Sequence, residues 1–147
     1  MTKSSASVNW NQAKVASILQ AVSSGVQEVT QRLEAAAKAN LSPGRGKRTG
    51  TLQRDIQARP PIIVGYRVIG RVATGAASKK YALVVHRGRG AIVAKPGKML
   101  RIVLANGDVL YRKRVGPAKA IPYMTDAFAT IKPGMRGVLA RYIKAVI

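Results

Sequence analysis

The sequence has few acidic residues and no cysteine. Five carboxylates stand against 26 lysines and arginines, which gives a formal net charge of +21 over 147 residues. The acids lie far apart along the chain, so no local carboxylate pair indicates general acid–base catalysis. Without cysteine there is no disulfide framework, no thiolate metal site and no thiol nucleophile. We therefore expect no enzymatic activity and no cofactor. The five acids are Glu28, Glu34, Asp55, Asp108 and Asp126.

Aromatic residues and long apolar runs are also scarce. Aromatics make up 5% of the chain, which leaves few platforms on which nucleic-acid bases could stack. No apolar run approaches the roughly 20 residues that cross a bilayer, and the first residues lack a signal-peptide pattern. We expect a soluble protein with no membrane partner. His86, the only histidine, has no nucleophile or orienting acid near it in sequence, which favours a structural or interface role over that of a general base.

The basic residues are spread over the whole chain, from Lys3 to Lys144. Apolar residues make up 47% of the composition, which argues against a disordered basic tail. A chain of this length suits one domain that buries roughly 70% of its unfolded surface. The folded surface itself must then be cationic, and such a surface repels copies of itself. This indicates a polyanionic or acidic partner, or a crowded assembly with counterions, rather than selection for solubility alone.

The first part of the chain has helical periodicity. Apolar residues at steps of three and four predict a long amphipathic helix over residues 9–40, with Ser7 or Asn9 as its N-cap and breakers at 41–44. Its polar face is mostly Gln, Ser and Glu, unlike a membrane-surface helix, so we expect it to pack against its own sheet or a neighbouring subunit. The apolar stripe consists of Val15, Ile18, Val22, Val26, Val29 and Leu33.

Residues 42–50 combine glycines with bases and predict a flexible cationic loop. The loop does not match a nucleotide-binding phosphate loop, because its Lys and Thr do not follow the second glycine at the required spacing and no strand precedes it. Two interpretations stay open: the loop tracks phosphates without reading sequence, or it is simply solvated. Its bases are Arg45, Lys47 and Arg48.

Residues 62–115 contain runs of apolar residues with the period-two alternation of β-strands. Asn106-Gly107 tolerates the positive backbone angles of a tight hairpin and is the clearest turn signal. The segment 87–98 is long enough to project as an arm, and such loops commonly carry contacts. The expected strands are Ile62–Ala73, Tyr81–His86, Met99–Leu104 and Val109–Val115.

The C-terminal part again has helical spacing. Pro122 is well placed to open a short helix that Pro133-Gly134 ends, and residues 135–147 form a second amphipathic segment. The fold class expected from the whole sequence is α+β. A long N-terminal amphipathic helix packs on an antiparallel sheet of about four strands, with short C-terminal helices, in a single domain over residues 1–147.

Three stretches carry a resemblance by their order and spacing: RTGTLQRDI at 48–56, YALVVHRG at 81–88 and AIPYMTDAF at 120–128. Together they resemble the neck and tail-completion (head-to-tail connector) proteins of long-tailed, non-contractile bacteriophages. Tyr123 stands where the family usually has Phe, Asp55 where it has Ser, and His86 and Arg87 where it often has an acid and an aromatic. The matching positions are Thr49, Gly50, Leu52, Ile56, Tyr81, Ala82, Gly88, Pro122, Met124 and Ala127.

The resemblance implies a structural virion protein that acts by shape and contact rather than by turnover. It would assemble with itself as a hexameric ring in the phage neck, formed in the host cytoplasm. Its partners would be portal, adaptor or head-stopper proteins on one side and tail-terminator or tail-tube proteins on the other. A tail terminator ring that caps the tail tube is an alternative with the same element order. A basic nucleic-acid-binding protein is an alternative of another class, although no recognition-helix or sheet-aromatic signature is present.

A ring of such cationic chains requires screening or acidic neighbours. We therefore expect the basic loops and one strand end to face acidic partner proteins or, non-specifically, DNA in the channel. The candidate contact residues are Arg45, Lys47, Arg48, Arg87, Arg89, Lys95, Arg112, Lys113 and Arg114.

Overall fold

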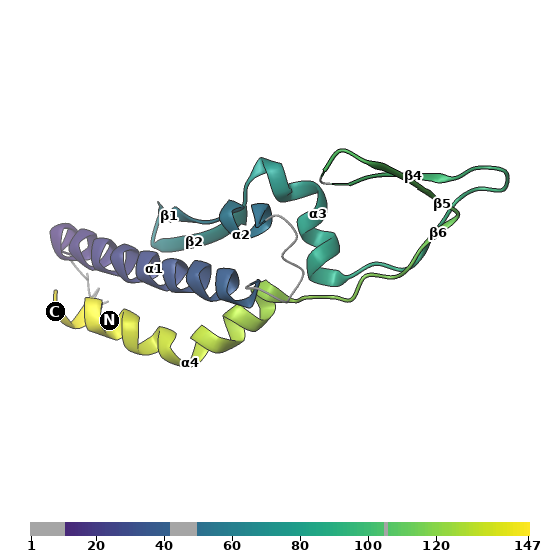
Figure 1. The fold of residues 1–147 in the computed structure, drawn as a ribbon. Coiled ribbons are helices and arrows are strands. Elements are labelled where there is room, and N and C mark those ends of the chain that lie inside the picture. Colours follow the sequence, from purple (N-terminus) through teal and green to yellow (C-terminus); the bar gives the residue numbers. More distant parts are fainter. Residues whose placement is uncertain (1–10, 42–49, 105) are drawn as a thin grey trace, which may run out of the picture.

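The computed structural model describes residues 11–41, 50–104 and 106–147, and it confirms the α+β class. Figure 1 shows a body of two long helices and a β-hairpin, from which an arm projects. The helices are α1 (Gln12–Asn40), α2 (Thr51–Asp55), α3 (Ala76–Arg87) and α4 (Tyr123–Lys144). The strands are β1 (Ile56–Val64), β2 (Arg67–Thr74), β3 (Ile92–Val93), β4 (Leu100–Val103), β5 (Val109–Arg112) and β6 (Arg114–Val115).

Helix α1 is the central element of the body, with the β1–β2 hairpin on one side and α4 on the other (Figure 1). Asn11 caps it by accepting a hydrogen bond from the Lys14 amide at 3.1 Å, whereas the predicted caps at 7 and 9 lie outside the described residues. Glycine permits close packing on both sides. A Cβ at Gly25 would meet Leu139 of α4 at 3.0 Å, and one at Gly70 of β2 would meet Val26 at 2.6 Å.

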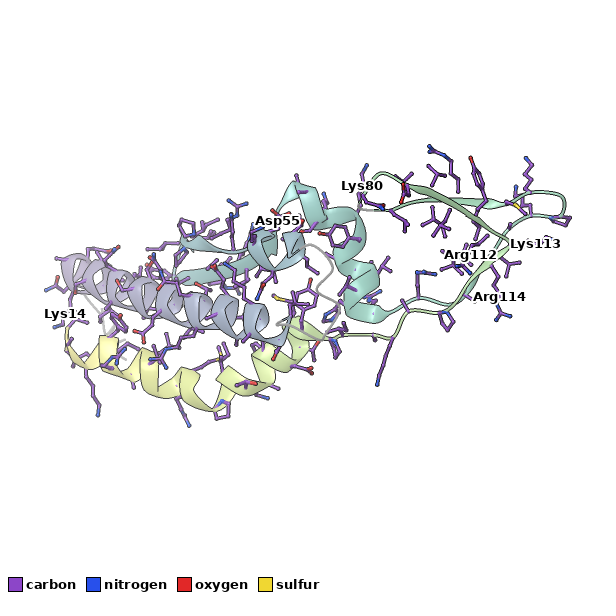
Figure 2. All side chains as sticks on the ribbon, viewed as in Figure 1. Lys14, Asp55, Lys80, Arg112, Lys113 and Arg114 are labelled. Carbon is purple, nitrogen blue, oxygen red and sulfur yellow. The ribbon has the colours of Figure 1, made fainter. Side chains whose placement is uncertain are left out.

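A polar network joins α1 to α4. The Glu28 carboxylate accepts hydrogen bonds from Tyr142 Oη at 2.9 Å and Arg141 at 2.6 Å, both on α4, and from Arg32 at 2.6 Å on its own helix. At the far end, Lys14 Nζ donates to the Val146 carbonyl (Figure 2). These contacts join α1, from its N-terminal end to Glu28, to the C-terminal end of α4 and the residues that follow it.

The C-terminal prediction of two short helices is wrong, because α4 continues through Pro133 as one helix. A proline inside a helix removes one backbone hydrogen bond and bends it, and α4 bends near its middle in Figure 1. The helix persists because apolar residues on both sides of the bend, Ala127 and Val138, are buried.

The predicted four-stranded sheet is also wrong, since the strands form three separate two-stranded antiparallel ladders. The segment 62–73, predicted as one strand, contains the end of β1, the turn and most of β2. β1 already begins at Ile56, and the chain reverses at Gly65, which has φ +58°. Pro60 and Pro61 lie at a register shift of β1, where their missing amides cost no ladder hydrogen bond.

The segment 81–86, predicted as a strand, lies within helix α3. Its apolar valines suggested a strand, but the residues that pack inward follow helical spacing from Ser78 through Ala82 to Val85. Asp55 at the end of α2 stabilises the helix start. Its carboxylate accepts from both the amide and the hydroxyl of buried Ser78, each at 2.8 Å. This cap comes from 23 residues away, which no local pattern shows.

The main core lies where the end of α1 meets α2, α3 and the start of α4. His86 packs edge-on against the Tyr123 ring at 5.2 Å between centroids, and burial raises the pKa of that tyrosine. Of the stripe predicted on α1, Val29 is buried and the other five residues are half-buried. The core residues are Ala37, Leu41, Leu52, Ile56, Ala82, Tyr123 and Ala127.

The network at Glu28 makes the α1–α4 contact sensitive to acid. The hydrogen bonds from Tyr142 and Arg141 lower the pKa of Glu28 below its usual 4.5. A carboxyl whose pKa is lowered by folding stabilises the fold above its unfolded pKa, and that contribution is lost as pH falls through the folded pKa. We expect Glu28→Gln to lower the melting temperature at neutral pH, with the difference from wild type shrinking below about pH 4.

Thermal unfolding followed by circular dichroism at several pH values tests this. Asp108→Asn is the control, because Asp108 makes no ion pair among the described residues. A difference between wild type and Glu28→Gln that stays constant down to pH 3 would contradict the expectation.

Candidate interaction surface on the arm

Residues 89–119 form an arm that leaves the body after α3 and returns to α4 (Figure 1). At its root the backbones of Arg89 and Ala118 exchange two hydrogen bonds, of 3.0 and 2.9 Å. β3 and β6 continue this pairing outward, with Ile92 opposite Val115. The predicted projection of 87–98 is thus one side of a longer, two-sided arm.

Two tight turns shape the arm. Lys98 donates its amide to the Lys95 carbonyl at 2.9 Å across Pro96-Gly97, and Gly97 has φ +73°, as a type II turn requires. The second turn confirms the hairpin predicted at Asn106-Gly107. Gly107 has φ +89°, and β4 and β5 pair on either side of it.

The β4–β5 ribbon, residues 100–112, exposes apolar side chains on both faces. Directly paired residues share a face, so Ile102 and Leu110 lie on one side and Val103 and Val109 on the other. Val103 is 55% exposed and Tyr111 60% exposed. A two-stranded ribbon without cover is marginally stable in water, so these faces are suited to burial against another molecule.

The junction between the ribbon and the β3–β6 pair gathers six bases, which we call the basic elbow. Strand pairing brings them together: Arg112 is opposite Leu100, Arg101 is opposite Tyr111, and the Lys113 carbonyl accepts from the Ala94 amide at 2.8 Å. Figure 2 shows part of the elbow far from the long helices. The elbow consists of Lys95, Lys98, Arg101, Arg112, Lys113 and Arg114.

The charge of the elbow is unbalanced. Asp108 is the only acid in residues 89–119, which hold eight lysines and arginines. All three ion pairs among the described residues involve Glu28 or Glu34 of α1, outside the arm. The elbow therefore presents unneutralised positive charge, while the ribbon, which runs back from the elbow toward α3 in Figure 1, presents apolar surface.

The structure brings together four of the nine predicted contact residues, Lys95 and Arg112 to Arg114, in the elbow. Arg89 is half-buried at the root of the arm, and Arg87 is exposed in the last turn of α3. Arg45, Lys47 and Arg48 lie outside the described residues.

The prediction missed two bases of the elbow, Lys98 and Arg101. The Pro-Gly turn and the hairpin signal together imply that these two residues lie close to Lys95 and Arg112.

The positions that carry the family resemblance serve packing and turns rather than an exposed surface. Gly50 is the N-cap of α2 with φ +71°, and Pro122 precedes the first turn of α4. Tyr81 and Met124 pack against the core, and Thr49 lies outside the described residues. The buried motif residues are Leu52, Ile56, Ala82, Tyr123 and Ala127.

Other kinds of site find no support in the described part of the chain. It contains no group of three or more histidines and acids that could hold a metal ion. None of its helices combines the length and hydropathy needed to span a membrane. His86 Nε2 lies 3.3 Å from Thr125 Oγ1 beside the Tyr123 ring, and its Nδ1 is buried. The arm is therefore the candidate functional surface.

The comparisons with known proteins give no family for the chain. No protein-family model matches it, and no curated protein or solved structure does so.

Gly88 anchors the arm to α3, with φ +74°. A side chain there would be strained and would also collide with the Ala118 carbonyl at 2.7 Å and the Ala120 amide at 2.8 Å. Gly97 has the same backbone strain, φ +73°, but open space around it. We expect Gly97→Ala to cost about 1–2 kcal/mol, and Gly88→Ala to cost about 2–5 kcal/mol because the collision adds to the strain.

Urea unfolding of both variants, followed by helical circular dichroism, measures the difference. Equal losses in the two variants would show that the contact at the arm root does not contribute.

Proposed function

We propose that the protein is a structural virion component that assembles with itself as a ring in the phage neck. There it would join the tail tube to the portal and its adaptors. The observation that carries this proposal is the β4–β5 ribbon, whose two apolar faces have no cover among the described residues. The order of the three family-like sequence stretches supplies the biological setting.

The shape of the chain supports a ring better than a symmetric dimer. A projecting arm and a separate body give one copy two different contact surfaces, and head-to-tail contacts between unlike surfaces generate rings when they close. The ribbon would be buried against neighbouring chains, whereas the basic elbow would meet acidic partner proteins or channel DNA. Catalysis plays no part in this role.

Nucleic-acid binding by a free protein is the second candidate, and the elbow favours it. A two-stranded β-ribbon fits the DNA major groove, and six bases at one end of the ribbon would contact phosphates. The apolar faces of the ribbon favour the ring instead, because phosphates offer them no complementary surface.

Salt dependence separates the two candidates. Apolar contacts between chains of net charge +21 are opposed by repulsion that salt screens. We expect the purified chain to form rings, seen by native mass spectrometry and electron microscopy, that persist or increase as salt rises. Phosphate binding behaves in the opposite way: six to ten contacts weaken affinity by roughly 1,000- to 100,000-fold between 50 and 200 mM salt.

A strict monomer, both alone and with neck proteins, would contradict the ring. Tight and steeply salt-dependent DNA binding by that monomer would establish the second candidate. Detection of the chain in purified mature particles by mass spectrometry would support the virion role, and its absence from them would contradict that role.

A further inference from the structure

The outer face of the β1–β2 hairpin carries an unusual pair of like charges. The inner face packs on α1 through Gly70, whose missing side chain leaves room for Val26 and Thr30. Because side chains alternate along a strand, Arg71 points away from α1, and it lies directly opposite Arg59. Like charges in directly opposed positions destabilise a sheet. Neither arginine side chain makes a hydrogen bond or ion pair with another described residue, so the pair is available to an anion.

Apolar side chains continue the same face beyond the arginines. Ile62 lies opposite Ile69, and Val64 follows opposite Arg67. Ile62 is 47% exposed and Val64 57% exposed. The surface thus combines a paired positive site with an adjoining apolar strip, and we call these residues the hairpin face: Arg59, Ile62, Val64, Arg67, Ile69 and Arg71.

The tip half of the β4–β5 ribbon has the complementary character. Ile102 and Leu110 lie opposite each other on one face, and Asp108, whose carbonyl accepts from the Leu104 amide at 2.8 Å, continues that face at the turn. Asp108 lies at the turn and makes no ion pair among the described residues. It receives a hydrogen bond from the Asn106 side chain. The tip thus offers one carboxylate beside apolar side chains.

The acids of the body are less suited to this site. Glu28 and Glu34 are held in ion pairs, and Asp55 caps α3. Asp126 lies in the first turn of α4, where the helix dipole stabilises a carboxylate. Asp108 makes no ion pair among the described residues and lies on a ribbon with exposed apolar side chains.

The described residues of one copy do not cover its own hairpin face. In Figure 1 the β1–β2 hairpin and the ribbon lie apart, on either side of α3. We propose that the ribbon tip of one copy docks on the hairpin face of a second copy. The Asp108 carboxylate would lie between Arg59 and Arg71, and Ile102 and Leu110, on the same face of the ribbon, would cover the adjoining apolar strip. This proposal rests on the proposed ring and names the contact that repeats around it.

Charge reversal tests the carboxylate contact. We expect Asp108→Arg to weaken self-association of the full chain roughly tenfold, the scale of a lost charge-assisted hydrogen bond. Asp126→Arg is the matched control, because it makes the same charge change on α4, and it should alter association by less than about twofold. Sedimentation velocity at a fixed salt concentration measures all the variants.

A variant in which the charges on both sides of the contact are reversed provides the decisive comparison. Adding Arg59→Glu and Arg71→Glu to Asp108→Arg inverts both sides of the contact, so association should recover toward the wild-type level. The glutamate variants that keep Asp108 should associate weakly, because the contact is lost even though the repulsion between copies is lower. A general effect of net charge would instead strengthen their association. Failure of the combined variant to recover, with all variants folded by circular dichroism, would overturn the docking contact.

Cross-linking tests the apolar contact independently. The chain has no native cysteine, so a variant with Leu110→Cys and Ile69→Cys carries only the two introduced thiols. Under mild oxidation it should form a ladder of linked copies, whereas Leu110→Cys with Phe128→Cys, at an exposed site on α4, should not.

The outcomes separate this proposal from the proposed function. Rings that form normally in Asp108→Arg, with no ladder from the cysteine pair, would overturn the docking contact and leave the ring intact. A wild-type chain that stays monomeric with its neck partners would overturn both. Association of the hairpin face with only an acidic partner protein would overturn self-docking.

Discussion

The position of every functional surface depends on the packing of the C-terminal half of α1 against the segments that follow it. The core around Ile56 and Tyr123 joins α1 to α2, α3 and α4, and both ends of the arm emerge from this cluster. Gly25 and Gly70 allow close packing of α4 and β2 on opposite sides of α1. Because this body is held together on both sides, the arm can project without cover of its own.

The molecule separates its apolar and charged surfaces along the arm. The basic elbow holds six positive residues at the outer end of the arm, while the ribbon that runs back from it toward α3 is apolar on both faces. A protein of net charge +21 meets repulsion when it self-associates. Apolar contacts and a few well-placed carboxylates are the interactions that overcome it, which is why the single acid of the arm, Asp108, carries weight in the proposed contact.

The elements that the sequence predicted well are those with strong local signals. The α1 stripe, the Asn106-Gly107 hairpin and the start of α4 after Pro122 all agree with the structure. The failures occurred where a distant contact decided the outcome. Asp55 caps α3 from another element, so a valine-rich segment that resembles a strand is helical. Burial on both sides of Pro133 keeps α4 in one piece.

The sequence by itself determined the charge imbalance, the α+β class and the existence of a basic, turn-rich excursion before α4, because these follow from composition and short-range periodicity. Only the tertiary structure decided that the strands form three separate pairs, that Lys98 and Arg101 join the elbow, and that Arg59 lies opposite Arg71. Cross-strand register depends on turn positions and on burial against α1, which are long-range properties that no local window of sequence contains.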